Sequence, residues 1–129
     1  MLRHWRKIIF VIVLAILLPS CGADRQLTSI TLIPTSVTFQ GPGAQIQFKA
    51  IGNYIHPPES SDITNSVQWS SNAPTVATVT NTGLATGVNT CGSGQILATV
   101  YSNPSNPSNG RVIVATAQVV DGNNGGICQ

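Results

Sequence analysis

The chain has 129 residues, of which 42% are hydrophobic and only 8% are charged. This composition excludes an intrinsically disordered chain and a nucleic-acid-binding protein that depends on a basic surface, so nucleic acid is not an expected partner. From Cys21 onward three basic residues stand against four acidic ones, a net charge of −1, and no electrostatically attracted partner is implied. One domain with one modest core is expected.

The first 20 residues have the pattern of an export signal. Basic residues come first, an unbroken apolar run follows from Ile8 to Leu18, and Cys21 comes shortly after its end. As a helix this run of eleven residues rises only about 16 Å, against about 30 Å for the hydrocarbon core of a bilayer. A transmembrane anchor is therefore not expected.

The segment Leu18-Pro-Ser-Cys21 resembles the lipobox of bacterial lipoprotein precursors. The resemblance implies cleavage before Cys21 and lipid on its thiol, which would hold the chain at a membrane. Gly22 in place of Asp favours the outer membrane if the host has two membranes. The alternative is an ordinary signal peptide that ends in a chance cysteine, and it is less favoured. The expected segments are a signal peptide (1–20), a lipidated tether (21–26), a domain (27–121) and a Gly- and Asn-rich tail (122–129).

After Gln26 the sequence changes to short alternating segments separated by Gly, Pro, Asn and Ser. The alternation is clearest over 45–50, where Ile46, Phe48 and Ala50 share one face and polar residues share the other. This pattern predicts an all-β sandwich of about seven short strands. The predicted strands are 29–33, 37–39, 45–50, 67–70, 75–79, 95–101 and 112–120.

Five segments resemble, in order, bacterial Ig-like domains of group 2. They are LTSITLIP (27–34), GAQIQFKA (43–50), VQWSSN (67–72), TVATV (75–79) and GLATG (83–87). The resemblance extends from residue 27 to about 120 and implies an Ig-like β-sandwich of the kind found on bacterial surface proteins, including adhesins. The loop 102–110 is longer than the hairpin usual before the last strand, and Cys91 and Cys128 are not typical of the family.

Aromatic residues are the candidates for contacts. Trp69 lies two residues after Val67, so both point to one face, and a buried packing role is favoured over a sugar-stacking platform. Tyr54 and Tyr101 stand at strand ends and are candidate exposed contacts, or they close the rim of the sandwich. The loop 102–110 is expected to be a passive connector. The predicted core comprises Ile46, Phe48, Val67, Trp69, Val76, Val79, Ile96 and Ala98.

No catalytic residue, metal site or cofactor is predicted. His56, Glu59 and Asp62 could be imagined as a cluster, but polar residues are expected in a solvated loop between strands. The glycines around Cys91 lack the lysine and helix of a phosphate-binding loop and are interpreted as a turn. An enzyme is therefore the least favoured function.

Cys91 and Cys128 remain if Cys21 carries lipid. An even number of cysteines in an exported protein predicts a disulfide between them, which would hold the C-terminal tail against the domain. The alternatives are two free thiols or a bridge to another chain.

Two functions follow from these observations. The first is a lipid-anchored, non-catalytic module on the cell envelope that binds a protein or a polysaccharide, with adhesion as the role implied by the family resemblance. The second is a structural or assembly subunit that supports an envelope complex through an exposed sheet edge.

Overall fold

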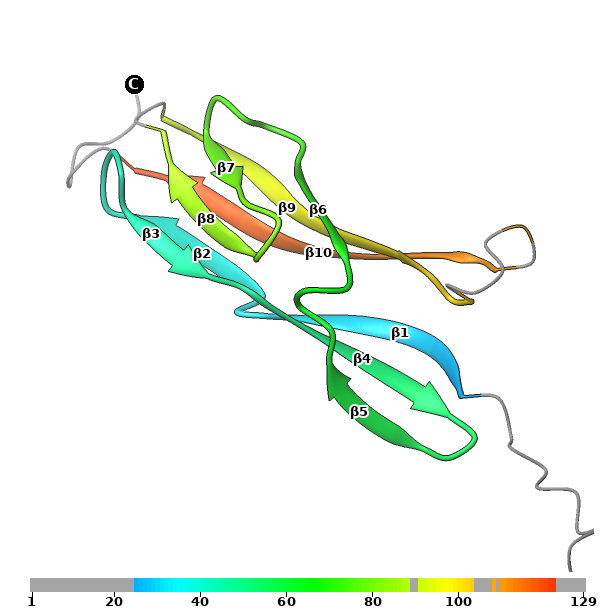
Figure 1. The fold of residues 1–129 in the computed structure, drawn as a ribbon. Coiled ribbons are helices and arrows are strands. Elements are labelled where there is room, and N and C mark those ends of the chain that lie inside the picture. The colour runs from blue at the N-terminus through cyan, green and yellow to red at the C-terminus, as the bar shows by residue number, and fades with distance from the viewer. Residues whose placement is uncertain (1–24, 89–90, 104–107, 109, 123–129) are drawn as a thin grey trace, which may run out of the picture.

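The fold is known from a computed structural model, which describes residues 25–88, 91–103, 108 and 110–122. Cys21, Cys128 and the predicted signal peptide lie outside these residues. Within them the chain forms ten strands (Figure 1). These are β1 (Gln26–Ile33), β2 (Ser36–Phe39), β3 (Gln45–Gln47), β4 (Lys49–Ile55), β5 (Glu59–Asp62), β6 (Gln68–Ser71), β7 (Ala77–Val79), β8 (Leu84–Gly87), β9 (Gly92–Tyr101) and β10 (Val112–Asp121).

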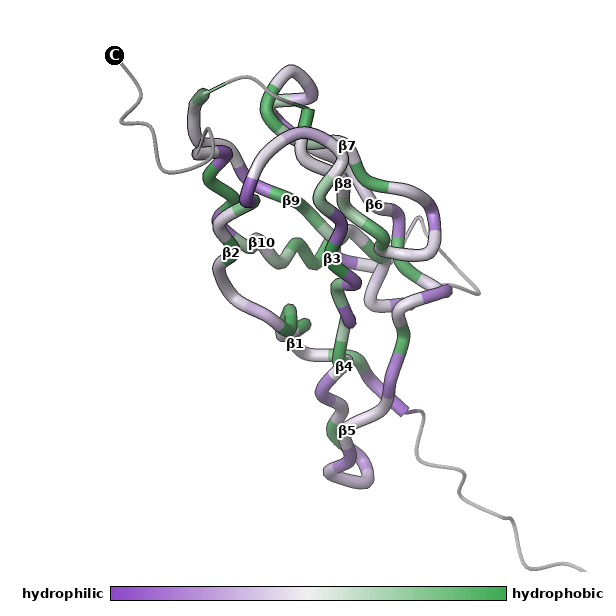
Figure 2. The backbone as a smooth tube through the Cα atoms, turned by 90° about the vertical axis from the view of Figure 1, so that its left-hand side faces the viewer, coloured by the Kyte–Doolittle hydropathy of each residue, from purple (hydrophilic) through white to green (hydrophobic). Residues whose placement is uncertain are grey.

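The strands form a sandwich of two layers. One layer is the four-stranded sheet β2-β10-β9-β6. The other consists of two three-stranded sheets, β1-β4-β5 and β3-β8-β7, which are joined because only Phe48 separates β3 from β4. In the view of Figure 2, β2 and β10 lie to the left of β3, β4 and β8. The all-β sandwich predicted from the sequence is confirmed.

The first strand segment contributes to both layers. β1 pairs antiparallel with β4, whereas β2 pairs parallel with β10 in the opposite sheet. The change of sheet occurs at Pro34, which has no backbone N–H and so cannot donate a hydrogen bond to continue the ladder. One stretch of chain therefore closes the sandwich along its side.

The core lies between the layers and receives apolar side chains from both. Phe48 and Trp69 are buried there with ring centroids 6.5 Å apart. The indole Nε1 of Trp69 donates a hydrogen bond of 2.8 Å to the carbonyl oxygen of Thr64, so its one polar group is satisfied. Of the residues predicted to form the core, Phe48, Val67, Trp69, Val76, Ile96 and Ala98 are buried, and Ile46 and Val79 are partly buried against them.

The strand count is higher than the sequence predicted, for three local reasons. β5 has the sequence ESSD, which shows no apolar alternation because it is an exposed edge strand beside β4. β8 has the sequence LATG, with two small residues buried, and no strand is predicted there from the sequence. The segment predicted as one strand over 45–50 divides at Phe48, whose N–H donates to the carbonyl oxygen of Gly83. β4 also continues to Ile55 through Gly52 and Asn53, which have low strand propensity.

Part of the predicted strand 75–79 is a turn. The N–H groups of Val76 and Ala77 both donate to the carbonyl oxygen of Ala73, and only Ala77–Val79 is a strand. Pro74 favours this turn because its fixed φ suits the second position of such a bend. The prediction that Thr75 and Val76 belong to the strand is therefore wrong.

Gly83 should tolerate no side chain. Its φ is +81°, and a Cβ there would lie 2.7 Å from the carbonyl oxygen of Phe48 and 2.9 Å from Cζ2 of Trp69. Gly43 has a similar φ of +76° but open space around it, so it is the matched control. We expect Gly43→Ala to cost about 1 kcal/mol for the left-handed backbone, and Gly83→Ala to cost about 1 to 3 kcal/mol more for overpacking. Denaturant unfolding measures both, and equal losses would contradict the proposed contact.

Trp69 should be a major source of stability. Trp69→Ala removes a large buried side chain, and we expect it to lower the free energy of unfolding by about 3 to 5 kcal/mol. Trp69→Phe keeps a ring but leaves the carbonyl oxygen of Thr64 without its indole donor, and should cost about 1 to 3 kcal/mol. A wild-type fluorescence spectrum that is red-shifted and freely quenched would show instead that Trp69 is exposed.

Candidate binding pocket

A polar pocket lies beside the junction of β3 and β4. Its cavity is about 580 Å³ and is lined by residues that include Gln47, Lys49, Asp62, Asn65, Ser66 and Thr82. These residues come from β3, β4, the end of β5, the segment that follows β5, and the turn before β8. Segments far apart in the sequence therefore form one surface.

Thr64 connects the pocket to the core. Its Oγ1 accepts a hydrogen bond of 3.0 Å from the backbone N–H of Ala50, and its carbonyl oxygen accepts the bond from Trp69. Its backbone N–H donates to Oδ1 of Asp62 at 2.9 Å. Asp62 is exposed, but its carboxylate is held in position by this hydrogen bond from the buried Thr64.

Gln47 fixes the opposite side of the pocket. Its Nε2 donates to the carbonyl oxygens of Phe48, at 2.8 Å, and of Thr82, at 2.7 Å. The second bond ties the turn before β8 to β3 and adds to the backbone bond between Phe48 and Gly83. The pocket wall is therefore positioned before any ligand enters.

The charges in the pocket are balanced. Hydrogen bonds from Thr64 lower the pKa of Asp62, and the nearby charge of Lys49 contributes in the same direction to a smaller degree. Asp62 is therefore ionised at neutral pH and stands near one ammonium group. A carboxylate, an ammonium, amides and hydroxyls suit a polar ligand that both donates and accepts hydrogen bonds.

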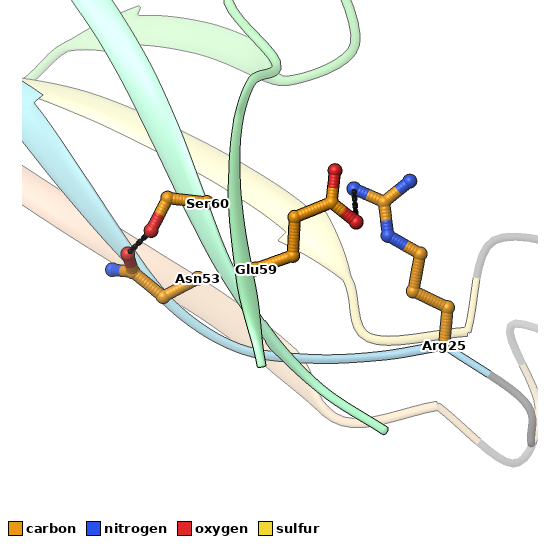
Figure 3. A network of polar contacts seen from close by, with 4 residues as sticks. All are labelled: Arg25, Asn53, Glu59 and Ser60. Atoms are coloured by element: carbon orange, nitrogen blue, oxygen red, sulfur yellow. Dashed lines mark hydrogen bonds and ion pairs between the residues drawn. The ribbon is translucent and has the colours of Figure 1, made fainter. Parts of the chain in front are cut away.

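The imagined cluster of His56, Glu59 and Asp62 does not assemble. The described residues contain no group of three or more His, Cys, Asp or Glu side chains that could hold a metal ion. Glu59 instead pairs with Arg25, with 3.4 Å between Nη2 and Oε2, and Asn53 accepts a hydrogen bond from Ser60 across the same hairpin (Figure 3). Asp62 belongs to the pocket.

The two tyrosines differ in surroundings. Tyr54 is partly buried, and the guanidinium of Arg25 lies 4.1 Å from its ring centroid, so this ring is already covered on one face. Tyr101 is exposed at the end of β9. The hairpin that follows is closed by two hydrogen bonds between Ser102 and Arg111. Residues 104–107 and 109 of the predicted connector loop lie outside the described residues.

Cys91 is exposed immediately before β9 and is not a free thiol. Its predicted bond to Cys128 stays a prediction, because Cys128 lies outside the described part of the chain. The same holds for lipid on Cys21. Over the residues that the structure describes, no helix is long and apolar enough to cross a membrane.

The site residues of the pocket were mostly missed by sequence reasoning. The alternation over 45–50 placed Gln47 and Lys49 only on the polar face of a predicted strand. Four further lining residues were not predicted to belong to any site: Thr64, Asn65, Ser66 and Thr82. The one available signal was the polar stretch Asp62-Ile-Thr-Asn-Ser66 directly before Val67 and Trp69, and an ordinary solvated loop has the same composition.

The sheet change of the first strand and the two packed layers define an Ig-like β-sandwich. A family model for the bacterial Ig-like domain (group 2) matches residues 26–108. The match includes more than half of the chain, which therefore belongs to this family. The resemblance seen in the sequence is confirmed.

One curated relative is the ice-binding protein 1 of Shewanella frigidimarina (strain NCIMB 400). It is 40% identical over 103 residues, which cover 70% of this chain but 11% of the relative. The chain thus corresponds to a small part of a much longer protein.

Asp62 should contribute to acid sensitivity. Because its pKa is lowered in the folded state, it stabilises the fold above its unfolded value of about 3.8, and this contribution is lost as the pH falls through the folded pKa. Asp62→Asn should therefore be less stable than the wild type near neutral pH, with a difference that shrinks in strong acid. Unfolding free energies measured across the acid range test this, and a difference independent of pH would contradict it.

Proposed function

We propose that this protein is a lipid-anchored, non-catalytic Ig-like module of the bacterial cell envelope that binds a hydroxylated polymer such as a polysaccharide. The main observation in support is the polar pocket, whose walls are fixed by hydrogen bonds from Thr64 and Gln47. Its cavity of about 580 Å³ is open to solvent and lined by polar groups, which suits a hydrated polymer. One or two sugar units of a chain could occupy it.

The proposed anchor is lipid on Cys21, which is the cysteine of the lipobox-like segment. Three residues separate Cys21 from Arg25, at the start of the described fold, so the domain would stay near the membrane. Gly22 favours the outer membrane in a host with two membranes. A disulfide between Cys91 and Cys128, both in the exported part, is included in the proposal.

The ice-binding protein supports a binding role only in general terms. This chain matches only 11% of that protein, so ice binding is not assigned to the chain. Membership of the Ig-like family supports a non-enzymatic module. Adhesion is the broader role that such a module would serve.

The pocket can be tested with single substitutions. We expect Lys49→Ala and Asn65→Ala each to weaken binding of the protein to envelope polysaccharide fractions by up to about tenfold, because each removes a hydrogen-bonding group worth about 0.5 to 1.5 kcal/mol. Gln118→Ala, at an exposed position of β10 outside the pocket, is the matched control. Calorimetry or a glycan array gives the affinities. Equal binding by all three variants would contradict the pocket assignment.

Crosslinking on intact cells separates the two functional classes. A binding module for adhesion should capture secreted or foreign polymers and proteins. Capture of resident envelope machinery, unaffected by the pocket variants, would favour the assembly subunit.

A further inference from the structure

Exposed apolar residues gather at one end of the sandwich. Among the described residues, the large hydrophobic side chains with substantial exposure are Val112 (55%), Ile33 (52%), Val114 (50%), Tyr101 (47%), Val88 (41%) and Ile55 (37%). Tyr101 and Val112 face each other across β9 and β10 at the hairpin end, and Val114 is two residues further along. Ile55 ends β4. The end of β9, the start of β10 and the end of β4 lie at the same end of the molecule in Figure 1, so four of the six belong to this end.

The chain enters the domain at this same end. Gln26, the first residue of β1, lies opposite Ile55 in the register of β1 and β4. Figure 1 places the start of β1, the turn between β4 and β5, and the hairpin of β9 and β10 at one end. We call this region the entry end, comprising Arg25, Ile55, Tyr101, Arg111, Val112 and Val114.

The length of chain before the fold places the entry end close to any lipid on Cys21. From Cys21 to Arg25 the chain can span at most about 14 Å when fully extended. The domain cannot turn far from the membrane on such a short connection. The entry end would therefore stay close to the membrane. If it did not contact the lipid, its exposed apolar side chains would remain in water beside a lipid surface.

The chemistry of the entry end suits lipid headgroups. A tyrosine places an apolar ring and a polar hydroxyl at the boundary between acyl chains and water. Arg111 is exposed next to Val112, and Arg25 stands at the start of β1, with its charge shared with Glu59. Basic side chains next to exposed apolar ones are attracted to anionic lipid headgroups.

We propose that the entry end docks on the lipid surface of the membrane that holds the anchor, with Tyr101 and Val112 at the level of the headgroups. This inference rests on the proposed lipid anchor. Docking at this end directs the opposite end of the sandwich, where β2 and β10 terminate, away from the membrane. The domain would then have one orientation rather than a freely rotating one.

Tryptophan fluorescence can locate the contact. Tyr101→Trp and the control Gln118→Trp, near the far end of β10, are prepared as acylated protein extracted from membranes and reconstituted in vesicles of phosphatidylcholine and phosphatidylglycerol. Brominated phosphatidylcholine quenches only tryptophans that reach the lipid. With the brominated lipid we expect the fluorescence of the Tyr101→Trp protein to be quenched, and its emission to lie at shorter wavelength than in water. We expect the Gln118→Trp protein to be quenched no more than the wild type, whose Trp69 is buried.

Flotation of the vesicles separates failure of the docking from failure of the anchor. If the protein floats with the vesicles but Tyr101→Trp is quenched no more than Gln118→Trp, the docking is wrong and the anchor stands. If the wild-type protein does not float with the vesicles, the proposed lipid anchor is wrong, and the docking proposal, which rests on it, is wrong as well.

Discussion

The contact between Gly83, Phe48 and Trp69 is the constraint on which the rest of the structure depends. Gly83 and Phe48 are joined by a backbone hydrogen bond of 2.8 Å, and a Cβ on Gly83 would strike the Trp69 ring. This close approach lies where one strand becomes β3 and β4, and so where the two smaller sheets meet. The turn before β8 can come this near because Gly83 has no side chain.

The same contact supports the pocket. Trp69 donates to the carbonyl oxygen of Thr64, and Thr64 in turn holds Asp62. Gln47 binds the turn that contains Gly83 from the other side through Thr82. The tryptophan that stabilises the core therefore also sets the position of Asp62, the one carboxylate among the described residues that line the pocket. Walls held in this way would change little on entry of the proposed ligand, which would reduce the entropy lost on binding.

Sequence reasoning found the elements that have a strong local pattern. Phe48 and Trp69 were placed in the core from alternation alone, and the β-sandwich followed from turn residues between short strands. It could not find β5, because ESSD is an exposed edge strand that has no apolar face to show. It could not find the pocket, because Lys49, Asn65 and Thr82 meet only through the pairing of distant strands. Metal and catalytic clusters were not predicted, because nearby polar residues in a loop need not converge. In the structure Glu59 pairs with Arg25.

The proposed function assigns different tasks to different parts of the domain. The entry end lies beside the short connection to Cys21, and the pocket lies on the side of the sandwich where β3 meets β4. The anchor and the docking of the entry end both depend on lipid at Cys21, so their most direct test is the intact mass of the protein extracted from bacterial membranes. The account predicts a mature chain that begins at Cys21 and is heavier than its sequence by the mass of a glyceride and its acyl chains. A chain that begins elsewhere, or that begins with an unmodified Cys21, would contradict it.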